Sequence, residues 1–235
     1  MDKKVAVVTG SAKGIGKELI ISLAKNNYDV VITYLTSERG ALKLQKYVMD
    51  NYNVKALAIK CDITKEDDIV NLKNNILEEY NHIDILINNA AYACVNYIDD
   101  KCKNEFMRVL EVNVVGTFLV TKYLYKYMND GVIVNISSTD AKDTYSDISM
   151  DYCASKAGIN SLTKTFALAF KNIKVIGVMP NWTNTESIRE MNPDYLKSEL
   201  KRIGQEKLED VKDVANNIIA LIDEKTIKSG DIRRV

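Results

Sequence analysis

Short, nearly continuous apolar runs alternate with longer amphipathic segments along most of this chain. The runs are rich in Val and Ile and cover residues 4–9, 29–35, 55–61, 83–88, 132–137 and 174–179, with a weaker run at 227–233. Strands buried on both faces of a parallel sheet have this composition, whereas half-exposed strands alternate apolar and polar residues. The pattern therefore predicts a parallel sheet of about seven strands.

The segments between the runs place apolar residues on one face of a helix. One such stripe follows the first run, and another precedes the fourth run, with Thr64 as a candidate N-cap. The stripes are Ile15, Leu19, Leu23 and Ala24, and Ile69, Leu72, Ile76 and Tyr80. Strand–helix–strand repetition predicts a Rossmann-like, doubly wound α/β fold with helices on both faces of the sheet. Because no linker or short repeat interrupts the pattern, we expect a single domain over residues 1–235.

Two later segments depart from a simple amphipathic pattern. The helix predicted over 153–170 ends in 166–170, a stretch that is apolar all round. Such a helix is buried on every face, and a second subunit can supply part of that burial. Residues 184–205 are charged and weakly periodic, so we expect a mobile segment that covers the substrate.

Composition and charge narrow the function classes. Lys and Arg together number 32, as do Asp and Glu, so the formal net charge is zero, which argues against nucleic-acid binding. No run approaches the roughly 18 apolar residues that cross a membrane, and no leader precedes the first run. We therefore expect a cytoplasmic protein without a membrane partner. The four cysteines, Cys61, Cys94, Cys102 and Cys153, lack metal-ligand spacing, which favours reduced thiols and no metal.

Three glycines follow the first predicted strand, where the chain turns into a helix. Gly10, Gly14 and Gly16 lie in the segment Thr-Gly-Ser-Ala-Lys-Gly-Ile-Gly at 9–16. A helix N-terminus carries free N–H groups and a positive partial charge, and glycine lets a phosphate approach the backbone. An ordinary glycine turn is the alternative. The strand before the loop and the apolar stripe after it favour pyrophosphate binding.

The spacing of these glycines, Gly-x3-Gly-x-Gly, differs from the common dinucleotide fingerprint and resembles the motif of the short-chain dehydrogenase/reductase family. Further matches follow in the family's order. They are residues 62–63 after the third strand, 88–91 after the fourth, Asn113 in a helix, Ser138 at the end of the fifth strand, the pair Tyr152 and Lys156, and the loop 180–185. Any one match is weak, but the ordered set extends from residue 9 to residue 185.

The resemblance implies roles for particular residues. The implied catalytic set is Asn113, Ser138, Tyr152 and Lys156. The implied cofactor contacts are Gly10, Ser11, Lys13, Gly14, Ile15, Gly16, Thr36, Ser37, Asp62, Ile63, Asn89, Ala90, Tyr152, Lys156, Pro180, Thr183 and Thr185. Thr139 stays open as an alternative to Ser138, because Ser138 precedes Tyr152 by one position more than is usual in the family.

Tyr152 and Lys156 also have a chemical interpretation of their own. They lie four positions apart on a predicted helix, so they share a face. A neighbouring ammonium favours phenolate and lowers the pKa of a tyrosine, which is otherwise about 10. The pair suits proton transfer to a carbonyl oxygen while hydride arrives at the carbon. Solvated surface side chains are the alternative, which the glycine loop in the same chain disfavours.

Asn113 lies in an apolar helical run, where a polar side chain needs hydrogen-bond partners. A core asparagine satisfied by backbone groups is one interpretation. The resemblance implies another, in which Asn113 bends the helix and holds a water molecule that links to Lys156. The two interpretations are compatible.

The cofactor preference depends on residues near the second strand. An acidic residue after that strand would bind the ribose 2′-hydroxyl of NAD, but no aspartate ends the strand. Lys13 resembles the basic residue of family members that use NADP, and Thr36 and Ser37 offer hydroxyl donors. We therefore expect NADP(H). Arg39 is a further candidate phosphate contact, and Glu38 is the residue that argues for NAD.

These inferences combine into one expected function. We expect an NADPH-dependent oxidoreductase that reduces a carbonyl to an alcohol with Tyr152 as proton donor. Within the family the chain is most similar to 3-oxoacyl-carrier-protein reductases, so the expected substrate is a small-molecule or carrier-bound carbonyl, including a 3-oxoacyl thioester. The family also implies a homo-oligomer, with a tetramer favoured over a dimer. The alternative is a catalytically silent NADP-binding regulatory or scaffold protein of the same fold.

Overall fold

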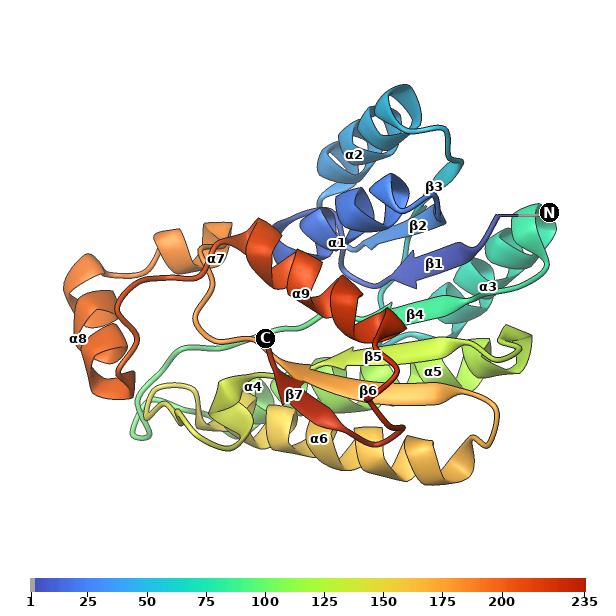
Figure 1. Cartoon of the computed structure of the whole chain (residues 1–235). Coiled ribbons are helices and arrows are strands. Elements are labelled where there is room, and N and C mark those ends of the chain that lie inside the picture. Colours follow the sequence, from blue (N-terminus) through green and yellow to red (C-terminus); the bar gives the residue numbers. More distant parts are fainter. Residues whose placement is uncertain (1–2) are drawn as a thin grey trace.

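Seven parallel strands form one sheet at the centre of the molecule (Figure 1). The computed structural model describes residues 3–235. The strands are β1 (Val5–Val8), β2 (Asp29–Tyr34), β3 (Ala56–Lys60), β4 (Ile85–Asn88), β5 (Val132–Ile136), β6 (Lys174–Met179) and β7 (Ile232–Arg234). Their order across the sheet is β3-β2-β1-β4-β5-β6-β7, which confirms the predicted doubly wound sheet. Strand β7 begins later than the predicted run, because Gly230 turns the chain in a left-handed conformation (φ +91°) just before it.

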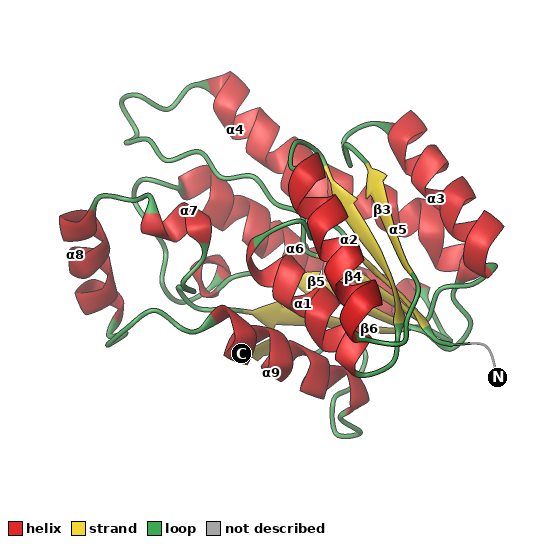
Figure 2. Cartoon of the chain, turned by 90° about the horizontal axis from the view of Figure 1, so that it is seen from above, coloured by secondary structure: helices red, strands yellow, loops and turns green. Residues whose placement is uncertain are grey.

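Helices cover both faces of this sheet, as the view from above shows (Figure 2). The α-helices are α1 (Gly14–Lys25), α2 (Glu38–Asn51), α3 (Glu66–Tyr80), α4 (Lys103–Leu110), α5 (Thr117–Leu124), α6 (Met150–Ala169), α7 (Glu186–Arg189), α8 (Pro193–Ile203) and α9 (Val211–Asp223). A π-helical turn, η1 (Glu111–Gly116), joins α4 to α5, and short 3-10 turns lie at η2 (Tyr125–Tyr127) and η3 (Thr139–Ala141). The helices α1, α2 and α9 pack on one face of the sheet, and α3, α5 and α6 pack on the other.

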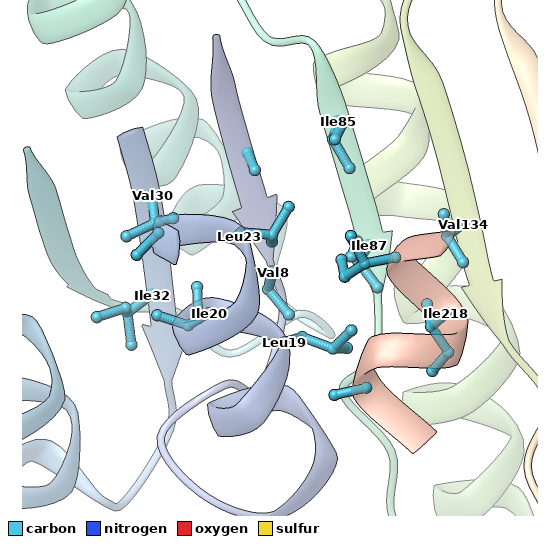
Figure 3. Close-up of a cluster of buried hydrophobic side chains, with 14 of the residues drawn as sticks. Val8, Leu19, Ile20, Leu23, Val30, Ile32, Ile85, Ile87, Val134 and Ile218 are labelled. Carbon is cyan, nitrogen blue, oxygen red and sulfur yellow. The ribbon is translucent and has the colours of Figure 1, made fainter. Parts of the chain in front are cut away.

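The inner strands send alternate side chains into these two cores. Ala6 and Val8 of β1 belong to the core under α1, whereas Val5 and Val7 belong to the core under α3. Figure 3 shows one of these cores, in which Val8 and its strand neighbours face the side chains of α1 and α9. All four β1 residues are fully buried. Burial on both faces is the reason why the strand sequences are continuous in apolar residues.

The N-terminus of α3 differs from the sequence prediction. Lys65, not Thr64, occupies the N-cap position. The Thr64 hydroxyl donates instead to Oδ1 of Asp62 at 2.7 Å, and the Thr64 N–H donates to the same atom at 3.1 Å. This local turn competes with capping for the hydroxyl. The prediction that Thr64 caps the helix is therefore wrong.

The apolar end of α6 is buried on one side only within a single chain. Phe166 is buried, but Leu168 is 84% exposed. A row of stacked rings covers this end of the helix. The ring centroids of Phe166 and Phe170 are 5.5 Å apart, and those of Phe170 and Tyr125 are 4.7 Å apart. The expectation of burial on every side does not hold for one chain.

Residues 184–205 form two helices, α7 and α8, rather than an irregular segment. The Thr185 side chain accepts a hydrogen bond from the Ile188 N–H at 3.4 Å, and Asn192 Oδ1 accepts from the N–H groups of the first turn of α8. Gly204 ends α8 in a left-handed conformation with φ +72°. A side-chain cap thus begins each helix, and a left-handed glycine ends α8.

No helix within residues 3–235 combines the length and the apolar content needed to cross a bilayer. The same residues contain no group of three or more His, Cys, Asp or Glu placed to hold a metal ion.

Candidate active site

The carboxyl ends of β1, β4, β5 and β6 lie side by side at one edge of the sheet. The chain order reverses between β1 and β4, and ligands of doubly wound sheets bind in the crevice at such a point. The loops that leave these strands carry the glycine segment 10–16, Asn89, Ser138 and the segment 180–185. The fold thus gathers at one edge groups that are far apart in the sequence.

The glycine loop packs closely against the chain after β4. Gly10 has φ +61°, and a Cβ atom there would lie 2.8 Å from Cα of Ala90. A Cβ atom at Gly16 would lie 2.6 Å from Nδ2 of Asn89. Gly14 has φ +57°, a conformation that favours glycine. Only glycine fits the first and last of these positions without a shift of neighbouring atoms.

Hydrogen bonds hold this loop in place. The Thr9 hydroxyl accepts from the N–H groups of Asn89 (2.9 Å) and Ala90 (3.0 Å), while Nδ2 of Asn89 donates to the carbonyls of Thr9 (2.9 Å) and Gly10 (3.1 Å). Ser11, which is fully buried, donates to the Val8 carbonyl at 2.8 Å. The side chains of Asn89 and Ser11 therefore fix the conformation of the loop. The hydroxyl of Thr9 has the same role; the sequence analysis did not predict this, although Thr9 is the first residue of the glycine motif.

The start of α1 is open to an anion. Lys13 is exposed and occupies the N-cap position, and its side chain makes no capping hydrogen bond. The N–H groups of the first turn are therefore not closed by a side chain, as a pyrophosphate site requires. Thr185, from the loop after β6, lies 3.6 Å from the position of a Gly14 Cβ atom. Gly14 and Thr185 thus lie at the same opening, as the resemblance implied.

The residues expected at the ribose lie beside the glycine loop. A Cβ atom at Gly40 in α2 would lie 2.7 Å from the Ser37 hydroxyl and 3.3 Å from the Ala12 carbonyl, so Ser37 is close to the loop. Thr36 is exposed. The Tyr34 hydroxyl donates to Oε1 of Glu38 at 3.2 Å. Glu38 is the acidic residue just after β2, and this hydrogen bond occupies one of its carboxylate oxygens.

The resemblance implies cofactor contacts at Asp62 and Ile63, and both side chains have partners within the protein. The Asp62 carboxylate accepts the two hydrogen bonds from Thr64, and Ile63 is 6% exposed and packs against Gly116, where a Cβ atom would lie 2.7 Å from its Cδ1. The side chain of Ile63 is therefore packed inside the protein, and little of it is accessible to a ligand.

The loop 180–185 contains a contact that explains an unusual residue. Asn181 replaces the glycine of the family pattern, and its Oδ1 accepts from the Thr139 hydroxyl at 3.1 Å. The Pro180 carbonyl accepts from the Thr139 N–H at 3.1 Å. Thr183 is 4% exposed and donates to the Asn181 carbonyl at 2.8 Å. Asn181 thus ties the loop after β6 to the loop after β5.

Tyr152 and Lys156 lie one turn apart near the start of α6. The Lys156 ammonium is 5.3 Å from the centre of the Tyr152 ring. Lys156 is 3% exposed, and its Nζ donates to the Ile136 carbonyl at 2.7 Å. On the face that the two residues share, Lys156 is therefore buried against the end of β5, while Tyr152 is only partly buried.

Electrostatics at this pair differ from the sequence expectation. Burial raises the pKa of the Tyr152 phenol, the negative charge of Asp140 raises it further, and a hydrogen bond with the Ser138 side chain lowers it. Burial lowers the pKa of Lys156 to about 8, and Asp140 opposes that change. We expected the Lys156 ammonium to lower the pKa of Tyr152; instead burial raises it, and the lowering influence comes from Ser138. The phenol therefore keeps its proton at neutral pH.

The geometry favours Ser138 over Thr139. The Ser138 side chain is close enough to Tyr152 to lower the pKa of the phenol. Thr139 is 1% exposed and directs its hydroxyl to Asn181. The chain between Ser138 and Tyr152, where we place the extra position in the loop 140–151, contains the 3-10 turn η3 and the start of α6.

Asn113 lies in the π-helical turn η1 and is 1% exposed. Its Oδ1 accepts from the Tyr92 N–H at 2.8 Å, and its Nδ2 donates to the Tyr92 carbonyl and to the Ser155 hydroxyl, both at 2.9 Å. Ser155 donates in turn to the Tyr152 carbonyl at 2.7 Å. Asn113 therefore joins the chain after β4 to the helix that carries Tyr152, and no direct hydrogen bond joins it to Lys156 in the described residues.

Sequence reasoning missed a buried ion pair next to Tyr152. Nζ of Lys101 lies 2.9 Å from Oδ2 of Asp151, and their side chains are 4% and 0% exposed. Lys101 also donates to the Cys94 carbonyl at 2.6 Å, and Asp151 Oδ1 accepts from the Tyr152 N–H at 2.9 Å. Neither residue stands out in the sequence, because their 50-residue separation hides the contact.

The sequence of the chain matches the family described as short chain dehydrogenase over residues 4–196. It is 31% identical to glucose 1-dehydrogenase 2 of Bacillus subtilis over 230 residues, which cover 94% of this chain and 88% of that protein. It is 29% identical to an uncharacterized oxidoreductase of Thermotoga maritima over 241 residues, 99% of this chain and 92% of that protein.

Solved structures show the same likeness. A short-chain dehydrogenase/reductase of Serratia marcescens superimposes with a TM-score of 0.90 at 26% identity, with 99% of this chain and 96% of that chain covered. A short chain dehydrogenase of Burkholderia cenocepacia in complex with NADP superimposes with a TM-score of 0.88, at the same identity and coverage. The family match spans most of the chain and includes the glycine loop, Ser138, Tyr152 and Lys156. This protein therefore belongs to the short-chain dehydrogenase/reductase family of oxidoreductases.

Proposed function

We propose that this protein interconverts a carbonyl and an alcohol with NADP(H), and that Tyr152 donates the proton to the carbonyl oxygen. One observation carries the proposal. The Tyr152 ring lies 5.3 Å from the ammonium of the buried Lys156 and next to the Ser138 side chain, at the sheet edge where the glycine loop opens. An arrangement of this kind suits general acid catalysis on a carbonyl oxygen.

The glycine loop fits a dinucleotide. Gly10 and Gly16 let the loop pack against the chain after β4 more closely than a Cβ atom would allow, and the first turn of α1 has no side-chain cap. A bound nicotinamide supplies the hydride that the reduction requires. Preference for the 2′-phosphorylated form rests on Lys13, Thr36 and Ser37. Support comes from the engagement of Glu38 by Tyr34 and from the NADP complex of the Burkholderia relative.

The proposed chemistry at the carbonyl is a proton transfer. The Ser138 hydroxyl donates a hydrogen bond to the carbonyl oxygen and holds it next to the Tyr152 hydroxyl. The phenol then gives its proton to that oxygen as negative charge develops there. Lys156, with its pKa at about 8, carries a positive charge at neutral pH and stabilises the phenolate that remains.

The proposed substrate is a small-molecule or carrier-bound carbonyl compound that α7 and α8 cover. A 3-oxoacyl thioester is one candidate, on the resemblance alone. The Bacillus subtilis relative is named for glucose, which makes a polyhydroxy substrate the second candidate. A screen of NADPH turnover over thioesters, sugars and simple ketones separates the two.

We also propose a homo-oligomer, with a tetramer favoured over a dimer. Phe118 is 43% exposed and Leu168 is 84% exposed, and both lie on the face of α5 and α6. Apolar residues gathered on a surface mark interfaces more often than not. A monomer mass in light scattering at micromolar concentration would contradict this.

The substitution Tyr152→Phe tests the catalytic assignment. It removes the hydroxyl and keeps the ring, so turnover should fall by about 10²–10⁴-fold. Binding of NADPH, followed by fluorescence titration, should change little. Near-full activity of the variant on the best substrate of the screen would show that Tyr152 is not the proton donor. A catalytically silent NADP-binding protein would bind NADPH and reduce nothing in the screen.

A further inference from the structure

Asp140 is a buried carboxylate that the proposed reaction does not use. It lies in η3, two residues after Ser138, and is 7% exposed. None of the ion pairs within residues 3–235 includes it. A buried charge without a partner is costly, and such groups gather at functional sites.

The hydrogen bonds of Asp140 leave acceptor capacity free. Its backbone N–H donates to the Ser138 hydroxyl at 3.1 Å, and its Oδ1 accepts from the Thr144 hydroxyl. No donor for Oδ2 exists among the residues that the structure describes. A carboxylate offers about four acceptor positions on its two oxygens, so most of this capacity is unused.

Asp140 lies close to the groups that would handle the carbonyl oxygen. The Asp140 N–H donates directly to the Ser138 hydroxyl at 3.1 Å, so only the Cα and Cβ atoms of Asp140 separate this N–H from the carboxylate. The negative charge of Asp140 also raises the pKa values of both Tyr152 and Lys156, which agrees with a carboxylate on the same side of the site.

We propose that Asp140 accepts a hydrogen bond from a donor group on the substrate carbon next to the carbonyl, so that the substrate is a hydroxy or amino ketone. This inference rests on the proposed function and sharpens it. A 3-oxoacyl thioester has no donor on the carbons beside its 3-oxo group, so the inference favours the polyhydroxy candidate. A substrate with an anionic group at that carbon would be repelled.

Two small ketones test this with the smallest change in shape. Hydroxyacetone and 2-butanone differ by a hydroxyl in place of a methyl group. Hydrogen bonds to charged groups correspond to about 10- to 150-fold in an equilibrium constant. The wild-type enzyme should therefore prefer hydroxyacetone by at least about tenfold in kcat/KM. Asp140→Ala should reduce the ratio to near one, and Asp140→Asn should give an intermediate value.

Further compounds and a matched variant complete the experiment. Aminoacetone reveals whether an ammonium is preferred to a hydroxyl, and pyruvate should be the poorest substrate. Asp143→Asn is the control, because Asp143 lies in the same loop and pairs with Arg234 at the surface. The Asp143→Asn variant should prefer hydroxyacetone over 2-butanone by the same factor as the wild type. The ratio of two substrates does not depend on how much of a variant is folded, so a merely structural role of Asp140 would leave it unchanged.

Several outcomes would overturn the inference. They are equal use of the two ketones by the wild type, an unchanged ratio in Asp140→Ala, and no turnover of any of the four compounds. Tyr152→Phe in the same assay separates the two proposals. If Tyr152→Phe is inactive but Asp140→Ala leaves the ratio of kcat/KM for the two ketones unchanged, only the inference about Asp140 fails. If Tyr152→Phe is fully active, the proposed function fails.

Discussion

The two sides of the site are held together in different ways. On the cofactor side, neutral groups position the glycine loop: the Thr9 hydroxyl, the Asn89 amide and backbone atoms. On the substrate side, charged side chains join separate segments, one pair of them buried. Lys101 and Asp151 link the chain after β4 to α6. Arg202 of α8 donates to the carbonyls of residues 144 and 145, at 2.8 Å and 2.6 Å.

This difference matches the tasks of the two sides. A dinucleotide is a fixed ligand, and a backbone cradle with no room for a Cβ atom suits it. The substrate side consists of loops and two short helices, in which a few long charged side chains fix the arrangement. Removing one partner of a buried ion pair is costly, whereas a neutral backbone contact is less sensitive to single substitutions. Variants should therefore affect the two sides separately.

The largest effect is expected for Lys101→Met. The substitution leaves the Asp151 carboxylate buried without its cation, which costs about 3–5 kcal/mol. The free energy of unfolding in urea should fall by that amount, while NADPH affinity of the folded protein stays unchanged. The double variant Lys101→Met/Asp151→Asn should recover much of the loss, because no unpaired charge remains.

Lys46→Met serves as the control for Lys101→Met. Lys46 pairs with Asp50 at 3.0 Å, but their side chains are 78% and 56% exposed. The urea midpoint of unfolding of the Lys46→Met variant should match that of the wild type. The same midpoint for Lys101→Met would mean that the buried pair does not hold the substrate side together.

The pH dependence of stability should show the burial of Lys156. Its pKa is about 8 in the folded protein and about 10.4 in an unfolded chain, so the unfolded state binds more protons between these values. Stability therefore rises with pH in this window. Relative to Lys156→Met, the free energy of unfolding of the wild type should increase by roughly 2–3 kcal/mol from about pH 7 to about pH 10. An equal pH dependence of the two proteins would contradict a buried ammonium.

A smaller and more selective effect is expected on the cofactor side. Lys13→Ala removes an exposed ammonium beside the glycine loop and should weaken NADPH binding by about 10- to 150-fold. Binding of NADH, measured by the same titration, should stay nearly unchanged. Arg39→Ala, three residues beyond Thr36, indicates whether Arg39 adds to the contact. Equal affinity of the wild type for NADPH and NADH would show that Lys13 does not select the phosphate.

Much of the fold and the grouping of the site could be predicted from the sequence. Continuous Val/Ile runs indicated strands buried on both faces, and the strand–helix–strand repeat indicated a doubly wound parallel sheet. The loops after β1, β4 and β5 carry polar residues, and their meeting at one sheet edge follows from parallel strands. The α7–α8 segment was harder: α7 is only four residues long, and the apolar stripe of α8 at Leu196, Leu200 and Ile203 is short and lies among charged residues.

The sequence by itself determined the strand and helix pattern, the glycine loop and the pairing of Tyr152 with Lys156, because these depend on neighbours within a few residues. The tertiary structure alone decided which contacts surround them. It turned Thr139 toward Asn181, left Ser138 next to Tyr152, buried Lys101 against Asp151, and buried Asp140 without an ion-pair partner two residues after Ser138. Burial and charge depend on segments that are distant in sequence, so the direction of the Tyr152 pKa shift could not be predicted before the fold was known.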